Sequence, residues 1–496
     1  MHPTASLLFL DGPILTMDKA RPVTDALAVV GDRIAALGED ARRMEGPHTR
    51  VVRLGPRCLI PGFVDAHNHF VSYGLRLMRL DLGRLNDKDE LLSAVRERAG
   101  MTPSDGWIVG HSWDETTWKD ATLPTQEELD RAAGGRKALL ARVDRHGGLV
   151  TSAALRAANV DEGPFVVEHE YAKVIALTTP TLPTLVKGIA AATRRAHELG
   201  VTSSHVMCAR DDFAALQAAR EAGALGVRVS CFIEEDKLPS AAELGARRGL
   251  GDAWIRFLGL KLYADGSFGS RTAAVSFPYL DGGASKGMFI HPEGRLESLV
   301  KQAKDAGLQV AVHAIGDRTV KRVVDAFEMA RVVPADRARI EHLELSSDAD
   351  VKRAASMGVV ASVQPNFTGE WGHRGQMYET RLGWDHARRL NRFADYEAAG
   401  LPLAFGSDDM PLGPLYGIWS AVTAPEMEQR VGIDAALRAY TAGAAWAGFA
   451  ENEVGTLREG MLADLVVLSG DPRAAADVRK LSVTLTVVDG RPVFER

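Results

Sequence analysis

The sequence predicts a (β/α)8 barrel of the α/β class, with a long insertion after its first strand and a small β-sandwich domain formed by both termini. Eight short apolar segments with helical periodicity between them indicate a parallel sheet covered by helices. Short strand-like runs separated by turn sequences stand at both ends of the chain. One interval between barrel strands is much longer than an ordinary strand-to-strand connection.

The two ends of the chain predict strands without a core of their own. Residues 6–60 contain apolar runs cut by Asp11-Gly12 and Gly31-Asp32, and glycine accepts the positive φ that a hairpin turn requires. Near the other end, 463–468 and 483–488 are similar apolar runs. We therefore expect residues 1–60 and 445–496 to pair into one discontinuous β-sandwich domain.

The middle of the chain, residues 61–444, predicts the barrel. Its helical segments are expected at 185–199, 213–222, 296–306 and 319–332. The eight expected strands are 62–66, 201–205, 228–232, 257–263, 309–312, 339–342, 359–363 and 403–406.

The interval between the first two barrel strands predicts an insertion. It spans roughly 130 residues, where a connection of a few residues plus one helix is typical. We place the insertion at residues 71–180. Because it leaves the carboxyl end of a barrel strand, where active sites of this architecture lie, we expect it to cover the site and shape the substrate pocket.

Composition excludes several classes of protein. The net charge of -6 provides no basic surface for nucleic acid, and no run of 18 apolar residues predicts a membrane span. The N-terminus lacks the features of a signal peptide, so a cytoplasmic protein acting on a small molecule is expected, either as a monomer or as a homo-oligomer. The three scattered cysteines predict neither a disulfide framework nor a thiolate metal site. A bound metal would therefore be held by histidines and carboxylates.

His67 and His69 follow the first barrel strand. Residues i and i+2 of a strand point to the same face, so the two imidazoles would project together and could form half of a metal site. The alternative is a coincidental pair on a half-buried strand, because a motif this short also arises by chance.

Further candidate ligands stand at other strand ends. Lys261 lies in the fourth strand, His313 and His342 end the fifth and sixth, and Asp408 follows the eighth. A single buried histidine is usually a core residue, and a single lysine can reach the surface along its aliphatic stem. Together with the histidine pair, these four residues predict a metal centre at the carboxyl end of the barrel.

The chain resembles the amidohydrolase superfamily, in the branch of amidohydrolase family 3 typified by N-substituted formamide deformylase. The resemblance spans almost the whole chain and rests on PGFVDAHNHF at 61–70, HSWDETTW at 111–118, GLKLYADGSFGSRTA at 259–273, VHAIGD at 312–317, RIEHLE at 339–344, VQP at 363–365, FGSDDMPL at 405–412 and GTLREGMLADLVVLSGDP at 455–472. These motifs are specific for the superfamily and much less specific for a substrate.

The resemblance implies a centre with one or two divalent metals per chain. His67 and His69 would bind the more buried ion together with Asp408, and His313 and His342 would bind a second ion. Lys261, N6-carboxylated by carbon dioxide, would bridge the two. Imidazole and oxygen ligands favour zinc, with manganese, iron and nickel as alternatives.

The implied activity is hydrolysis of a non-peptide, amide-type C–N bond by metal-activated hydroxide, with Asp408 as the proton shuttle. One alternative is a deaminase or cyclic-amide hydrolase that uses a single metal on the same barrel. The other is a catalytically silent scaffold, although none of the expected ligands is missing.

Three weaker candidates would contact the substrate. Arg271 could bind an anionic group or form a loop salt bridge, and His146 could face the substrate or lie in a surface loop. Trp113 could line the pocket or belong to the core of the insertion. His205 stands where many relatives have an acidic residue, and this difference bears on the substrate rather than on the reaction class.

Overall fold

The computed structural model of the protein describes residues 4–115, 118–120, 122–142, 147–161 and 163–496. Contacts divide the chain into two compact units, one formed by residues 1–70 with 193–496 and the other by residues 71–192. The first unit holds the barrel and the terminal strands.

The barrel is a nearly closed sheet of eight parallel strands, so the predicted fold class is confirmed. The order β18-β17-β16-β15-β14-β13-β12-β6 follows the chain, and each predicted strand is present within a few residues of its expected bounds. The strands are β6 (Phe63–Asn68), β12 (Val201–Cys208), β13 (Arg228–Ile233), β14 (Ile255–Tyr263), β15 (Gln309–Ala314), β16 (Arg339–His342), β17 (Val360–Val363) and β18 (Leu403–Phe405).

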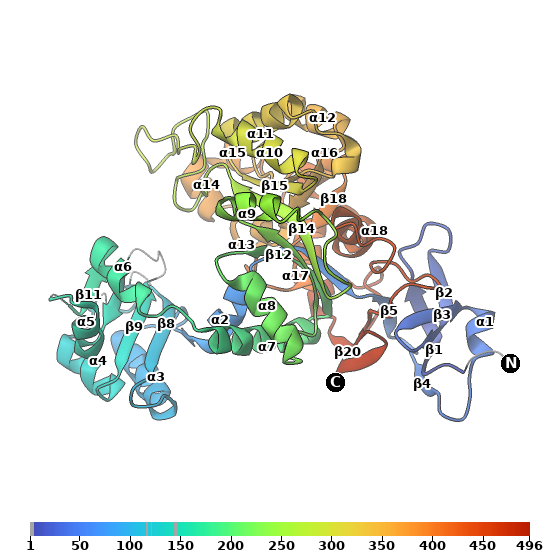
Figure 1. Ribbon diagram of the computed structural model, residues 1–496, viewed down its shortest axis with the longest axis horizontal. Helices are drawn as coiled ribbons and strands as arrows, with labels where there is room; N and C mark the ends of the chain where they lie inside the picture. Colours follow the sequence, from blue (N-terminus) through green and yellow to red (C-terminus); the bar gives the residue numbers. More distant parts are fainter. Residues whose placement is uncertain (1–3, 116–117, 121, 143–146, 162) are drawn as a thin grey trace. The chain divides into compact units, whose positions relative to one another are not determined.

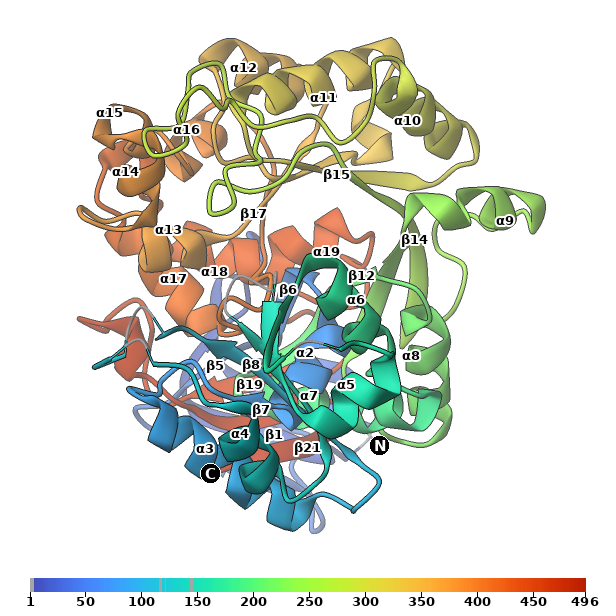
Figure 2. The ribbon, with the colours of Figure 1, turned by 90° about the vertical axis from the view of Figure 1, so that its left-hand side faces the viewer.

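Helices cover the outside of the barrel. Figures 1 and 2 both show α10, α11 and α12 side by side. In each of these helices the buried residues recur at helical spacing. The four helical segments expected from periodicity are confirmed as α7, α8, α10 and α11. The helices that follow barrel strands include α7 (Leu182–Glu198), α8 (Asp212–Glu221), α9 (Leu238–Glu243), α10 (Arg295–Asp305), α11 (Asp317–Met329), α12 (Asp348–Ser356), α13 (Pro365–Trp371), α16 (Phe393–Ala398), α17 (Pro414–Thr423), α18 (Ile433–Arg438) and α19 (Ala444–Ala447).

Strands from both termini share a second sheet, in which β19 pairs antiparallel with β5 through Leu465 opposite Pro61. Apolar side chains are buried on both of its faces, Leu7 and Phe9 on one and Leu8 and Leu10 on the other. The domain boundaries themselves stay a prediction. The strands are β1 (Leu7–Leu15), β2 (Val23–Val30), β3 (Arg33–Leu37), β4 (Arg50–Arg53), β5 (Cys58–Pro61), β19 (Leu465–Leu468), β20 (Val483–Val488) and β21 (Arg491–Glu495).

The unit of residues 71–192 has its own five-stranded sheet in the order β11-β10-β9-β8-β7 and its own apolar core. Helix α4 begins with a capping box between Thr125 and Glu128 and ends at Gly134, whose positive φ of 58° completes the C-cap. That this unit shapes the substrate pocket stays a prediction. Its elements include α2 (Phe70–Met78), β7 (Leu80–Asp81), α3 (Lys88–Met101), β8 (Trp107–Trp113), α4 (Gln126–Ala133), β9 (Lys137–Arg142), β10 (Gly147–Val150), α5 (Ser152–Ala158), β11 (Phe165–Val167) and α6 (Glu168–Ala176).

Among the described residues, no helix combines the length and the apolar character that crossing a membrane requires.

Candidate metal centre

Strand β6 delivers two histidines to the carboxyl end of the barrel. His67 is buried, with 1% of its side chain exposed, whereas 32% of the His69 side chain is exposed. The ring centroids lie 5.8 Å apart. The two imidazoles therefore line one site, with His67 at its floor and His69 nearer its opening.

Hydrogen bonds join the end of β6 to the segment after β18. The buried Asp65 carboxylate accepts from the backbone N–H groups of His67 (3.1 Å) and Ser407 (2.9 Å) and from the Ser407 hydroxyl. The backbone N–H of Asp408 donates to the carbonyl of His67 (2.8 Å). Burial raises the pKa of Asp65 to about 6, and these hydrogen bonds oppose the rise. The network fixes the position of Asp408 opposite the two histidines.

Asp408 is held in a tight backbone turn. Its φ of 50° and the φ of 59° at Asp409 are left-handed values that aspartate tolerates better than most residues. Gly406, just before the turn, lies so close to His67 that a Cβ atom would collide with the His67 backbone. Glycine at this position lets the end of β18 approach β6.

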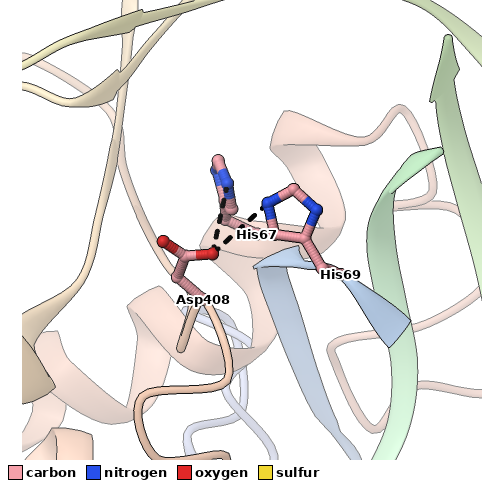
Figure 3. A group of neighbouring side chains, drawn as sticks. All are labelled: His67, His69 and Asp408. Atoms are coloured by element: carbon pink, nitrogen blue, oxygen red, sulfur yellow. Dashed lines mark ion pairs between the residues drawn. The ribbon is translucent and has the colours of Figure 1, made fainter. Parts of the chain in front are cut away.

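His67, His69 and Asp408 form a compact group of three candidate ligands, shown in Figure 3. Oδ1 of Asp408 lies 3.5 Å from Nε2 of His69 and 3.9 Å from Nε2 of His67. Nε2 of His67 is buried and has no hydrogen-bond partner among the described residues. A buried lone pair aimed at a carboxylate and a second imidazole suits a divalent cation, so the donor set fits a metal of the zinc type.

Lys261, His313 and His342 lie at the ends of the neighbouring strands β14, β15 and β16. The ring of His342 lies 4.9 Å from that of His67 and 4.4 Å from that of His313, centroid to centroid. Nζ of Lys261 is buried without a hydrogen-bond partner among the described residues, 4.4 Å from the ring centroid of Tyr263. These three residues border the same site but lie outside its compact ligand group.

One ring nitrogen of each of these histidines is engaged by the protein. Nε2 of His313 donates to the carbonyl of Gly266 (3.0 Å), and Nδ1 of His342 donates to Oε1 of Gln364 (2.7 Å). The remaining nitrogens, Nδ1 of His313 and Nε2 of His342, then carry the lone pairs. Burial lowers the pKa of His313 to about 3 and keeps that of His342 well below its usual value, so both stay neutral, as ligands must be.

Sequence reasoning gave no role to Glu341 or Arg339, which lie fully buried beneath the site. Oε2 of Glu341 lies 2.5 Å from Nδ1 of His67. The signal was present in the RIEH motif, because two charged residues at i and i+2 of a buried strand must share a face and find partners.

The weaker substrate candidates are not brought together. Trp113 is fully buried in the core of its unit and donates from Nε1 to the carbonyl of Leu140 (2.7 Å). Both Arg271 Nε and Nη2 bind the Asp281 carboxylate, at 2.9 and 2.8 Å. His146 lies outside the described residues. Each of the two described candidates already has an internal partner, so its contact with substrate stays a prediction.

Comparison with known proteins agrees with the geometry. The sequence profile of the amidohydrolase family matches residues 50–494. YtcJ of Bacillus subtilis is 29% identical over 530 residues, covering 98% of each chain. N-substituted formamide deformylase of Arthrobacter pascens is 25% identical, covering 100% of this chain and 99% of its own.

A solved structure shares the fold. An uncharacterized metal-dependent hydrolase of Pyrococcus furiosus superposes with a TM-score of 0.81 and 28% identity, over 94% of this chain and 99% of that one. The profile match spans most of the sequence and both units, and it includes the strands that carry the histidines and Asp408. The chain therefore belongs to the amidohydrolase family and is a hydrolase of carbon–nitrogen bonds.

Proposed function

We propose that the protein hydrolyses a non-peptide, amide-type C–N bond in a small molecule, with N-formyl and N-acyl amines as the substrate class. The group formed by His67, His69 and Asp408 carries the proposal, because it joins two imidazole nitrogens and a carboxylate at the end of the barrel where substrates bind. The likeness to N-substituted formamide deformylase supports the choice of substrate class.

His67, His69 and Asp408 would hold a divalent ion, with zinc favoured by the nitrogen and oxygen donors. A bound divalent ion lowers the pKa of water from 15.7 to about 7 and polarises a carbonyl oxygen. Asp408 is the proton carrier: its carboxylate accepts the proton of the attacking water and passes it to the leaving nitrogen, which departs poorly without a proton. Asp408 lies beside the histidines and keeps 17% of its side chain exposed, so water can reach it.

We further propose that His313 and His342 bind a second ion, and that N6-carboxylated Lys261 bridges the two ions. Carbon dioxide reacts with a neutral amine, and burial lowers the pKa of Lys261 from 10.5 to about 8. A lowered pKa leaves a larger fraction of the amine neutral at pH 7 than in an ordinary lysine. The orphaned Nζ and its neutral histidine neighbours support this assignment.

The second candidate is a deaminase or cyclic-amide hydrolase with a single ion. One observation favours it: among the described residues, His67, His69 and Asp408 form a compact ligand group without the other histidines. Metal analysis separates the candidates. Two equivalents per chain that fall to one in Lys261→Ala support the two-metal form, and one equivalent with an active Lys261→Ala variant supports the single-metal form.

The proposed activity is tested by incubating zinc-loaded protein with N-formyl, N-acyl and carbamate compounds and measuring the released amine. Chelator-treated protein serves as the control, and cyclic amides and aminopurines are tested in parallel. Amine release from linear amides that stops on metal removal is expected. Turnover of the cyclic amides or aminopurines alone would contradict the choice of substrate class. Cytoplasmic location, homo-oligomerisation and independence from nucleic acid stay predictions.

A further inference from the structure

A buried charged network lies directly beneath the metal centre and connects four barrel strands. Arg339 and Glu341 of β16 have no exposed side-chain surface, and neither takes part in the hydrolysis proposed above. Burying a charge is costly unless it is paired and hydrogen-bonded, so this arrangement needs a reason.

Each nitrogen of the Arg339 guanidinium has at least one hydrogen-bond acceptor. Nε donates to Oε1 of Glu341 (2.7 Å), Nη1 to Nδ1 of His205 (2.8 Å), and Nη2 to Oε2 of Glu341 (3.2 Å) and Oγ of Ser362 (2.7 Å). Nη2 also donates to the carbonyl of Ala66, next to His67. This fork keeps Glu341 paired as a carboxylate and ties it to β6, β12 and β17.

His205 contributes a neutral acceptor to this network. Burial first, and the Arg339 charge second, lower the pKa of His205 to about 3, so the ring is uncharged. Its Nδ1 accepts from the guanidinium and therefore carries no proton. Glu341 is then the one carboxylate bonded to Arg339 among the described residues.

Glu341 in turn fixes the protonation state of a candidate ligand. An ionised carboxylate can only accept, so the proton between Oε2 of Glu341 and Nδ1 of His67 belongs to the imidazole. The lone pair of His67 is then on Nε2, the atom that faces Asp408. A carboxylate behind a metal-binding imidazole orients the ring and makes it a stronger donor.

We propose that Glu341, held in place by Arg339, is the positioning residue of the metal centre. It fixes His67 as the Nδ1–H tautomer and strengthens Nε2 as a ligand. This inference rests on the proposed function only in that His67 binds the metal. It assigns a role to the charged pair of the RIEH motif, and it identifies His205 as part of the support for the site.

Glu341→Gln tests the proposal, because it keeps the size of the side chain and removes its charge. Zinc affinity is measured by competition with a chromophoric chelator, and stability by chemical unfolding of the metal-free protein. Loss of a supporting partner of this kind costs metal affinity typically 10–100-fold, and we expect a loss in that range. Unchanged zinc affinity in Glu341→Gln would overturn the inference.

Asp464→Asn is the matched control. Asp464 also forms a buried two-point pair with an arginine, Arg228, at 2.8 and 3.1 Å, but it contacts no candidate ligand. It should lower stability and leave zinc affinity unchanged. An equal loss of zinc affinity in both variants would mean that Glu341 acts only through folding, and would also overturn the inference.

A measurement on the wild-type protein covers the case in which Glu341→Gln does not fold. In metal-free protein with 15N-labelled histidine, the two ring nitrogens of His67 are identified by comparison with His67→Asn. The Nδ1–H tautomer supports the inference, and the Nε2–H tautomer overturns it. Wild-type protein that binds no metal would instead contradict the proposed function, and the two failures are thereby distinguished.

Discussion

The substitution Asp408→Asn should remove the proton-transfer group of the site while leaving its fold and hydrogen bonds nearly unchanged. Asparagine has nearly the same shape, tolerates the positive φ of 50° at this position, and leaves intact the bond from the backbone N–H to the carbonyl of His67. We therefore expect the free energy of unfolding to change by less than about 1 kcal/mol, because Asp408 is partly exposed and its contacts to the histidine nitrogens, at 3.5 and 3.9 Å, are long.

The activity of Asp408→Asn should fall much further than its stability. Losing a general acid–base group lowers kcat about 10²–10⁴-fold, which raises the barrier by roughly 3–5 kcal/mol at 1.36 kcal/mol per tenfold change. The assay is the initial rate of amine release at saturating substrate. The variant is first reconstituted to the metal content of the wild-type protein. A remaining loss of activity is then due to lost proton transfer and not to lost metal binding.

Asp409→Asn is the control for Asp408→Asn. Asp409 has the same chemistry one residue later, and its carboxylate accepts from the backbone N–H of His69 (3.1 Å), a bond that an asparagine oxygen can retain. We expect a loss of less than about tenfold, because this side chain lies outside the compact ligand group. Near wild-type activity in Asp408→Asn would refute the assignment of the proton carrier.

Three further predictions follow from the described contacts. Trp113→Phe should lower the free energy of unfolding by about 1–3 kcal/mol, because the carbonyl of Leu140 loses its buried donor. A changed KM at unchanged stability would instead show that Trp113 contacts the substrate. Arg271→Gln should alter the free energy of unfolding by less than about 1 kcal/mol and leave KM unchanged, because the partly exposed arginine is paired with Asp281. A KM raised more than tenfold would show that Arg271 binds substrate. Asp212→Asn should weaken the pH dependence of unfolding between about pH 4 and pH 6. Burial raises the pKa of Asp212 from 3.8 to about 6, so its contribution to stability is complete below pH 3.8 and falls as pH rises through about 6, by up to about 3 kcal/mol. Urea unfolding of both proteins across this range measures the effect, and parallel curves would contradict it.

The barrel could be predicted from the sequence because its signals are local. Each strand is an apolar run bounded by turn residues, and the helices between strands repeat their apolar positions with helical period. At the ends of the chain, the turn at Gly31-Asp32 was predicted correctly, because it joins β2 and β3. The turn expected at Asp11-Gly12 was wrong: these residues lie within β1, where the pairing with β2 shifts register between Leu10 and Ile14. The order of the strands in the barrel follows from the short, right-handed connections that place successive parallel strands side by side.

The ligand group was predictable for a different reason. His67 and His69 are spaced to share a face of one strand, and a barrel brings the ends of all its strands to one side, which places Asp408 near them. Whether Trp113 faces a pocket or the core could not be predicted from the sequence. A tryptophan in a strand motif can face a pocket or a core, and the partner carbonyl of Leu140 is fixed only by the folded sheet.

The support of the metal centre lies beyond local sequence. Glu341 meets His67 across 274 residues of chain, and Arg339 meets His205 across 134. Such pairs depend on which inward positions of different strands share a layer of the barrel, and that depends on register. A sequence motif shows that buried charges exist, whereas only the fold shows which ones meet.

The metal content of His67→Asn/His69→Asn is the most direct test of the centre. Wild-type and variant protein are loaded with zinc, dialysed together against metal-free buffer, and analysed by elemental mass spectrometry. We expect at least one equivalent of zinc per wild-type chain and a loss of that equivalent in the variant, with catalytic activity lost in parallel. Wild-type zinc content in a folded variant would contradict the assignment of this site.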